Sequence, residues 1–404
     1  MTVEAQERVQ PAVLAPLRSR LTWVVILSFA SGFPFGLFND LIPVYLRLSG
    51  ASRREIGLLS ALALPWALKF LWAPAVDRIG SRRRWIAGTQ IGLAIALLFL
   101  SGSGGSVSPA FFVVLLTLVA LSATQDVAVD GYTIEIMERD ELGPANGTRV
   151  MGYRVGMIVA GGVLVAASAR LGWSAVFLAG AALYALSAAV TRAMPEAARK
   201  HDPQESWIEP LRELLSRPEI LVAGLFVLTF KLGDLALIPM VKPFWVDSGY
   251  TVQQIGLVQT TLGVGASVVG ALLGGEVIRR IGAFTALWVL GLVQALSNLT
   301  YWAAAVTGAT KPVMYSAAIV EQFTGGLGTA AFLTFLMTLS SKQYAATQFA
   351  LLSALYRVGG IGAGVMSGEL AERMGYSSYF LLTFVLALPA FALLPWVKHA
   401  AAKD

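Results

Sequence analysis

The stretch SATQDVAVDGY, residues 122–132, lies near the end of a long apolar run that begins at about residue 111. Asp126 and Asp130 are one helical turn apart, so in a helix the two carboxylates share a face. A lone arginine, Arg154, follows in MGYRVG (151–156), near the start of another apolar run. Charged side chains are costly inside a bilayer, where they usually mark the path of a solute or an ion. The stretch therefore indicates membrane-spanning helices that carry functional charges.

Composition extends this indication to the whole chain. Of the 404 residues, 56% are hydrophobic and 13% are charged, against roughly 45–50% and about 25% in soluble domains. This is too little charge to cover a soluble surface, so we expect an integral membrane protein. The chain has no cysteine, and its two histidines, His201 and His399, lie in polar stretches, so we predict no metal site and no cofactor. The net charge of +6 fits basic cytoplasmic loops better than nucleic-acid binding.

Apolar segments of about 20 residues, the length that crosses a bilayer, recur along the chain. We predict an all-α membrane protein with twelve transmembrane helices, at residues 21–46, 54–76, 85–102, 109–133, 149–169, 173–193, 219–246, 254–278, 283–306, 313–339, 347–371 and 377–397. The polar stretch 194–218 is the predicted cytoplasmic linker between an N-terminal six-helix bundle, 1–193, and a C-terminal one, 219–404. Lys and Arg are concentrated in the loops of one side, which places both termini in the cytoplasm.

Short motifs recur between the two halves in the same order, at offsets of about 200 residues. The recurring motifs are LIP at 41–43 and 237–239, IGL at 56–58 and 255–257, and YRVG at 153–156 and 356–359. We therefore predict two parallel six-helix repeats around a central pathway. This layout resembles that of the major-facilitator transporters.

In that fold the first span of each three-span unit lines the cavity, and most of the polar residues within the spans fall on those spans. The predicted substrate and proton pathway consists of Asn39, Asp40, Lys69, Lys231, Asp234, Glu321, Gln322 and Arg357. Structural interpretations remain open for several of them: Asp40 near the outer interface, Lys69 extending to the inner one, and Lys231 and Asp234 neutralising each other. Glu321 has no local partner, and because burial disfavours a charged carboxylate, it is the candidate proton carrier.

The loop after the second span reads DRIGSRRR, residues 77–84. It resembles the D-R-x-G-x-R-R signature between spans two and three of major-facilitator proteins. An acid at a helix end can pair with bases on neighbouring helices when the cytoplasmic side is closed, although a plain positive-inside loop is the alternative. The predicted cytoplasmic gate consists of Asp77, Arg78, Arg82, Arg83, Asp126, Asp130 and Arg154.

Seven segments in order along the chain resemble the AmpG-like peptide/acetyl-CoA transporter family. They are SGFP (31–34), LKFLWAPAVDR (68–78), SATQDVAVDGY (122–132), GYRVGM (152–157), KLGD (231–234), EQFTGGLGTAAFLTFLM (321–337) and ATQFALLSAL (346–355). The resemblance implies a monomeric importer in the bacterial inner membrane that works by alternating access, driven by the proton gradient. Its partners would be a small-molecule substrate and the lipid bilayer, without nucleic acid. An enzyme is not expected, because no nucleophile–base set is found.

Two substrate classes remain open within this family. AmpG-type permeases carry anhydro-muropeptides together with protons for cell-wall recycling, and they usually have two more spans. The shorter RhtX/FptX siderophore permeases carry ferric siderophores of the pyochelin or rhizobactin type. Because the sequence predicts twelve spans, we predict siderophore import, with proton-driven muropeptide import as the alternative.

Overall fold

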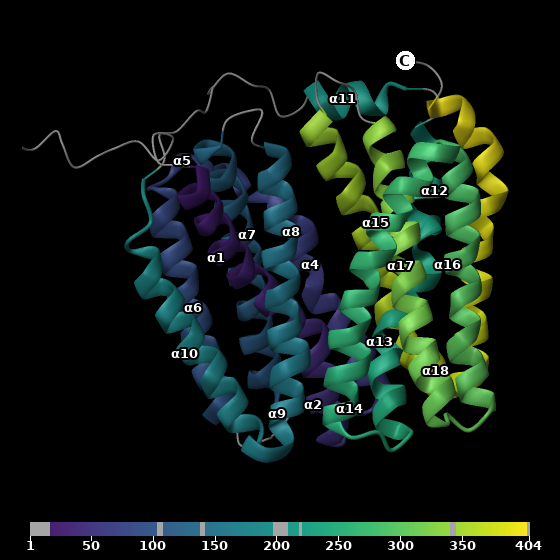
Figure 1. The fold of residues 1–404 in the computed structure, drawn as a ribbon, viewed down its shortest axis with the longest axis horizontal. Helices are drawn as coiled ribbons and strands as arrows, with labels where there is room; N and C mark the ends of the chain where they lie inside the picture. Colours follow the sequence, from purple (N-terminus) through teal and green to yellow (C-terminus); the bar gives the residue numbers. More distant parts are fainter. Residues whose placement is uncertain are drawn as a thin grey trace, which may run out of the picture. The chain divides into compact units, whose positions relative to one another are not determined.

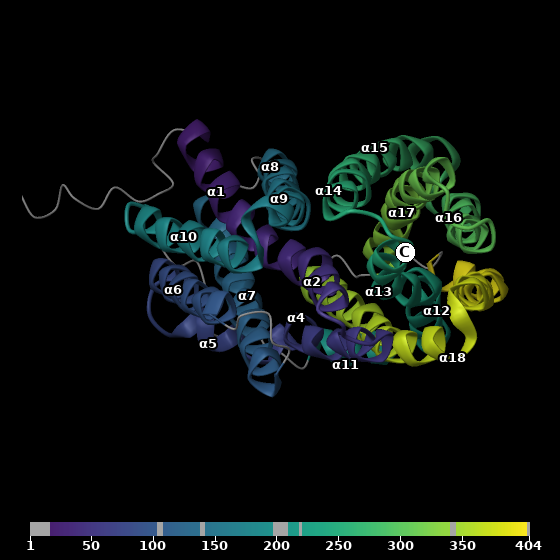
Figure 2. The same ribbon diagram turned by 90° about the horizontal axis from the view of Figure 1, so that it is seen from below.

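In a computed structural model of the chain, the described residues are 17–102, 108–137, 142–196, 209–217, 220–339 and 345–401, and helices are their only regular secondary structure. The chain divides into two compact units. Unit 1 comprises Met1–Ser49 and Leu68–Pro203, and unit 2 comprises Gly50–Ala67 and Gln204–Asp404. Within each unit the long helices run side by side (Figure 1) and form a cluster when viewed end-on (Figure 2).

Unit 1 is built from eleven helical segments of the described residues. They are α1 (Leu17–Gly36), η3 (Leu37–Leu41), α2 (Ile42–Leu48), η5 (Lys69–Leu71), α5 (Ala73–Arg78), α6 (Arg82–Gly102), α7 (Pro109–Ile136), α8 (Leu142–Met157), η6 (Ile158–Val163), α9 (Leu164–Leu171) and α10 (Trp173–Thr191). The segments η3 and η6 are π-helical turns inside otherwise α-helical spans.

Unit 2 begins with a piece of the second predicted span and continues after the linker. Its segments are α3 (Arg53–Leu58), η4 (Leu59–Ala63), α4 (Leu64–Leu68), α11 (Glu209–Leu215), α12 (Ile220–Phe230), α13 (Leu232–Asp247), α14 (Val252–Gln254), η7 (Ile255–Leu262), α15 (Gly263–Ile281), α16 (Ala283–Val306), α17 (Lys311–Leu339) and α18 (Ala345–Ala401). Part of the predicted linker, 197–208 and residue 218, lies outside the described residues. The division into two six-helix bundles stays a prediction.

Ten helices of the described residues are long and apolar enough to cross a membrane. The longest, Leu351–Val397, is two helices that meet at Gly375, where a φ of 76° breaks the helical path. The second predicted span is instead a series of short helices from α3 to α5. Pro65 and Pro74 each lack an N–H donor and stand in the first turn of a new helix. With these two differences, the helices occupy all twelve predicted positions, and the all-α membrane architecture is confirmed.

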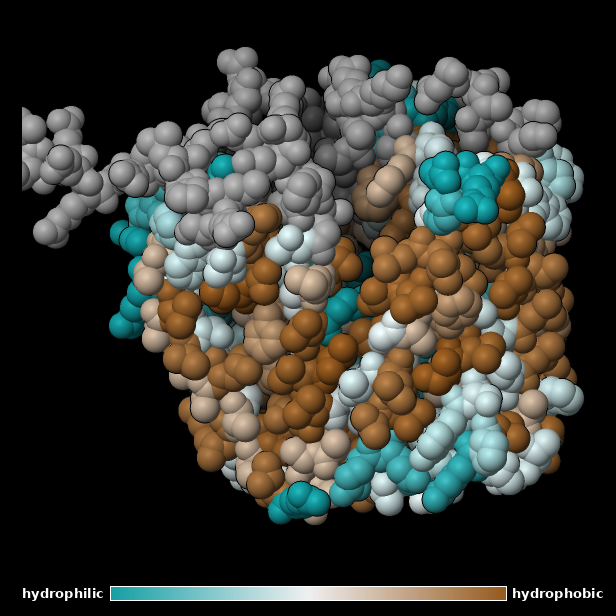
Figure 3. All heavy atoms as spheres, in the orientation of Figure 1, coloured by the Kyte–Doolittle hydropathy of each residue, from teal (hydrophilic) through white to brown (hydrophobic). Residues whose placement is uncertain are grey.

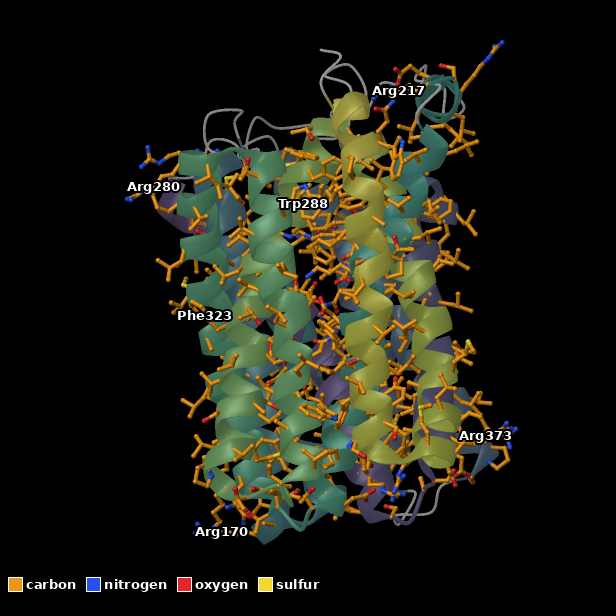
Figure 4. The ribbon with its side chains drawn as sticks, turned by 90° about the vertical axis from the view of Figure 1, so that its right-hand side faces the viewer. Arg170, Arg217, Arg280, Trp288, Phe323 and Arg373 are labelled. Carbon is orange, nitrogen blue, oxygen red and sulfur yellow. The ribbon has the colours of Figure 1, made fainter. Side chains whose placement is uncertain are left out.

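The side chains of unit 2 are distributed as a membrane protein requires. Hydrophobic residues cover the middle of its helices and hydrophilic ones gather toward the ends (Figure 3). Arg217 and Arg280 lie at one end of the unit, and Arg373 lies at the other (Figure 4). An apolar band between polar ends matches the hydrocarbon core between two aqueous interfaces.

A buried tyrosine near the end of each unit donates to a backbone carbonyl of an earlier helix. Pro34 inside α1 has no N–H, so the carbonyl of Ala30, four residues back, loses its helical donor. Tyr184 of α10 donates its hydroxyl to this oxygen at 2.6 Å. In unit 2, Tyr379 of α18 donates to the carbonyl of Ala236 in α13, also at 2.6 Å. A buried tyrosine hydroxyl thus bonds to the helix backbone in both units.

The recurrence of IGL extends to the helix start before it. Ser52 accepts from the backbone N–H of Glu55, whose carboxylate accepts from the Ser52 backbone in return. Thr251 and Gln254 form the same reciprocal pair at the start of α14. Such a capping box satisfies two of the free donors at a helix start. The second and eighth predicted spans therefore begin in the same way.

Glycines allow α1 and α8 to approach closely. Gly32 of α1 faces the backbone of Tyr153, and Gly156 of α8 faces the backbone of α1. A Cβ added at Gly156 would lie 2.8 Å from the amide nitrogen of Phe33, too close for a side chain. These positions need glycine because small residues bring the backbones of membrane helices together.

Candidate functional site

The seventh predicted span is broken in its middle, at Lys231. This residue has φ −98° and ψ 2° and separates α12 from α13, and Asp234 lies in the first turn of α13. The N-terminal end of a helix favours negative charge. Interrupted helices of this kind form the binding sites of many transporters.

Lys231 and Asp234 form the centre of a buried polar cluster in unit 2. The Lys231 ammonium donates to Gln294 Oε1 at 2.7 Å, to Thr329 Oγ1 at 3.0 Å and to Asp234 Oδ2 at 3.3 Å. The amide of Gln294 also donates to Asp234. Lys231 and Asp234 are 6% and 8% exposed, so three helices, α13, α16 and α17, supply a balanced polar site in an apolar interior.

Glu321 of α17 faces the same cluster. A Cβ added at Gly325 would lie 3.8 Å from Glu321 Oε1 and 3.9 Å from Gln294 Nε2, so both side chains border this glycine. The charges that act on Glu321 are those of Asp234, Lys231 and Lys242. The structure thus brings together three residues of the predicted pathway, Lys231, Asp234 and Glu321.

Gln294, Thr329 and Lys242 were not predicted as site residues. Lys242 is 3% exposed and donates to Thr260 Oγ1 at 2.8 Å, in the π-helical turn η7. A lone lysine inside an apolar span is the signal that identifies it. For Gln294 the signal is the series of polar residues at 294, 298 and 301, which repeats at the helical period.

A second charged cluster lies in unit 1. Lys69 stands at the start of η5, in the broken second span, with its Nζ 4.0 Å from Asp126 Oδ2 and 3.8 Å from Asp130 Oδ2. Arg149 of α8, which was not predicted, also pairs with Asp130. Lys69, predicted for the substrate pathway, therefore lies with two of the predicted gate residues.

Two π-helical turns meet around Asp40. Asn39 and Asp40 lie in η3, where Asn39 donates to its own helix at Phe35 O over 3.0 Å. The side chain of Asp40 lies directly against Gly161 of η6. Because π turns concentrate at functional sites, Asp40 remains a candidate for the pathway in unit 1.

The loop at 77–84 forms part of a polar pocket in unit 1. Gly80 has φ +65°, which favours glycine. Arg82 donates to Glu135 Oε1 at 3.1 Å with both side chains buried, and Arg83 bonds Glu196 at 2.7 Å. These residues line a pocket of about 370 Å³. The side chains of Asp77 and Arg78 lie outside the described residues.

Three predicted residues remain to be placed. Gln322 packs against Gly263 of α15. Arg154 is half-buried on α8. Arg357 is exposed, with its guanidinium 5.8 Å from the centre of the Tyr356 ring. No group of three or more acidic or histidine side chains that could hold a metal ion occurs in the part of the chain that the structure describes.

Comparison with known proteins assigns the chain to a family. The family model of the Major Facilitator Superfamily matches residues 24–364, and the chain belongs to this family. Over 383 residues the chain is 33% identical to the anhydromuropeptide permease of Escherichia coli K12, covering 92% of this chain and 78% of that one. An AmpG-named transporter from Rickettsia conorii is 29% identical over 399 residues, covering 94% of this chain and 96% of that one.

Two solved structures share the fold. A point mutant of the nucleoside transporter NupG superposes with a TM-score of 0.76 at 18% identity, covering 94% of this chain and all of that one. A bacterial homologue of the human lysosomal transporter Spinster, inward-facing and unoccupied, has a TM-score of 0.76 at 19% identity, covering 96% and 98%. The family match and the relatives, together with this fold, make the protein a multi-pass membrane transporter of the secondary type and not an enzyme.

Proposed function

We propose that the protein imports anhydro-muropeptides into the cytoplasm together with protons. The observation that carries this proposal is the 33% identity to the Escherichia coli anhydromuropeptide permease over 92% of the chain. The proposed substrate is therefore the anhydro-muropeptide, which was the alternative in the sequence analysis, and not the siderophore.

The number of spans does not separate the two substrate classes. The sequence favoured siderophores because AmpG-type permeases usually have two more spans than the twelve predicted here. The chain nevertheless spans 96% of the AmpG-named transporter of Rickettsia conorii. A chain of this size therefore fits the AmpG group, and the relatives reported above supply no support for a siderophore.

The polar groups match the chemistry of a sugar-linked peptide. Such a solute carries hydroxyls, amides and carboxylates, which need both donors and acceptors in a desolvated site. Lys231, Asp234, Gln294 and Thr329 supply both kinds in unit 2. In this proposal Glu321 is the proton carrier, since burial and the charge of Asp234 disfavour its ionised form while the charges of Lys231 and Lys242 favour it.

The proposal places the protein in the inner membrane with both termini in the cytoplasm, working as a monomer. In unit 2, Arg217 and Arg280 share one end, as the positive-inside rule requires of a cytoplasmic side (Figure 4). By the positions of their residues in the predicted topology, the clusters around Asp126 and Arg82 belong to the cytoplasmic ends of their spans and act as a gate.

The experiment is uptake in cells that express this chain and lack their own permease for either solute. Labelled anhydro-muropeptide and a labelled ferric siderophore are supplied in parallel, with and without an uncoupler. We expect uptake of the muropeptide alone, abolished by the uncoupler. Uptake of the siderophore alone would contradict the proposal and restore the other substrate class.

A further inference from the structure

A row of polar side chains follows one face of α16 inside unit 2. Gln294, Asn298 and Tyr301 are spaced four and three residues apart, so they lie on the same face of the helix. Gln294 is 5% exposed, Asn298 1% and Tyr301 not at all. Gln294 belongs to the cluster around Lys231, and the other two lead from it toward the end of the unit where α16 meets residues 307–310.

Four buried polar atoms along this row have no hydrogen-bond partner among the described residues. They are the nitrogen and oxygen of the Asn298 amide, the hydroxyl of Tyr301 and the indole nitrogen of Trp245. Asn298 lies beside Asp234, and Tyr301 lies beside Trp245 and Gln259, but outside hydrogen-bonding geometry. Burying such groups without a partner is unfavourable, so four together point to a bound ligand.

The ligand that fits these atoms is water. The four atoms include donors and acceptors from two helices, and buried water typically makes about three hydrogen bonds to otherwise unsatisfied groups. Polar groups slightly too far apart for a direct bond are commonly bridged in this way. The rings of Phe244 and Phe380 lie against Tyr301. Water fits between such rings and the polar row more easily than a bulky solute does.

We propose that ordered water lies along this row between α13, α16 and α17, bound by Asn298, Tyr301 and Trp245, and that it conducts protons to and from Glu321. This inference deepens the proposed function and rests on its proton coupling. Of the ionisable groups, Asp234 lies beside Asn298 and the charge of Glu321 acts on Tyr301, while Lys231 and Lys242 of the seventh span act on Glu321.

The conduction step conserves charge along the row. A proton that leaves Glu321 bonds to the nearest water, and that water passes a different proton to the next. Each water therefore gives up one proton and accepts one. Asn298 and Tyr301 orient the waters without changing their own charge, which makes them positioning residues for the proton carrier.

Radiolytic hydroxyl-radical labelling of the whole protein in detergent tests the water directly, without any substrate. Radicals formed from bound water modify buried side chains next to it, so we expect Tyr301 to be labelled. Tyr379 is the matched control, since it is equally buried and its hydroxyl is already bonded to Ala236 O at 2.6 Å. Equal protection of both tyrosines would overturn the proposal.

The variant Asn298→Leu tests the proton role in proteoliposomes. We expect it to reduce proton-driven accumulation of labelled anhydro-muropeptide about tenfold or more, and to lower the labelling of Tyr301. Exchange of internal for external muropeptide moves no net proton and should stay near the wild-type rate. Ser297→Ala is the control, because the Ser297 hydroxyl is bonded within its own helix to Gln294 O at 2.6 Å.

Wild-type accumulation by Asn298→Leu would overturn the proton route. A wild-type protein that exchanges no muropeptide contradicts the proposed substrate instead, and the labelling of Tyr301 still decides whether water occupies the row. The two proposals therefore fail by different measurements.

Discussion

Lys231 and Asp234 are close in sequence, but their role depends on residues that are distant in sequence. Their spacing of three residues left mutual neutralisation open as an alternative to a role in the pathway, and in the structure the Lys231 Nζ lies 3.3 Å from Asp234 Oδ2. Sequence alone could not show that Gln294 and Thr329, about 60 and 100 residues away, complete the cluster. Contacts between distant segments depend on tertiary packing, which local patterns do not encode.

The Lys231–Asp234 pair should stabilise the fold only as a pair. Removing one member leaves the other charge buried, so Lys231→Met or Asp234→Asn alone should cost about 3–5 kcal/mol of unfolding free energy. The double variant carries no net charge and should recover part of that loss. Thermal unfolding in detergent measures all three, and a double variant whose loss equals the sum of the single losses would contradict this role.

The role proposed for Asp126 depends on the residues that surround it. Its carboxylate lies 4.0 Å from Lys69 Nζ, and its Oδ1 is buried without a hydrogen-bond partner among the described residues. In the proposed topology this places it in a gate rather than at the substrate.

Asp126→Asn should therefore slow turnover more than it weakens substrate binding. Loss of the charge weakens the pairing with Lys69 that a gate must form and release. Transport rate and binding affinity, measured for the same purified protein, separate the two effects. Glu276→Gln, which alters an exposed carboxylate on α15, serves as the control, and a weaker affinity with normal turnover would contradict the gate.

The positions of the helices were predictable from the lengths of the apolar segments, whereas the interruptions within the helices were not. The twelve spans follow from hydropathy, since a bilayer requires about 20 apolar residues. The helix breaks at Leu68 and Lys231 could not be predicted in this way, because neither residue is a proline. Both have φ −98°, with ψ 3° at Leu68 and 2° at Lys231. Both interrupted spans carry a lysine, at the break or directly after it, that contacts an aspartate.

Close packing of α1 against α8 should make Gly156 sensitive to a single added carbon. Gly156→Ala would push the two backbones apart, so we expect a loss of about 1–3 kcal/mol in unfolding free energy. Gly88→Ala is the matched control, since Gly88 is an exposed helical glycine with nothing within 4 Å of an added Cβ. Equal thermal stability of the two variants would contradict the close approach.

The second predicted span divides between the two units. Residues 50–67 pack within unit 2, where Gly57 faces the backbone of Gly368. Arg53 donates to Ala371 O at 3.0 Å and lies 4.3 Å from the centre of the Tyr376 ring. From the sequence we assigned this segment to the N-terminal half, because only its position along the chain was known. The residues that it contacts cannot be read from the sequence.

Arg53 should hold this segment against α18. Arg53→Ala removes both contacts, and we expect a cysteine introduced by Ser60→Cys to react faster with a water-soluble maleimide. The chain has no other cysteine to interfere. Arg373→Ala, which removes an exposed arginine paired with Glu369, is the control, and unchanged labelling of Ser60→Cys in Arg53→Ala would contradict the role.

For the whole molecule, the transporter class follows from the fold and the family, whereas the solute and the driving force rest on the proposal. The most direct test of proton-coupled muropeptide import is accumulation of labelled anhydro-muropeptide by proteoliposomes with an imposed inward proton gradient. We predict uphill accumulation by the wild type, and by Glu321→Gln only exchange without accumulation, because glutamine cannot carry a proton. Wild-type accumulation that ignores the gradient, or equal accumulation by Glu321→Gln, would contradict proton coupling through Glu321.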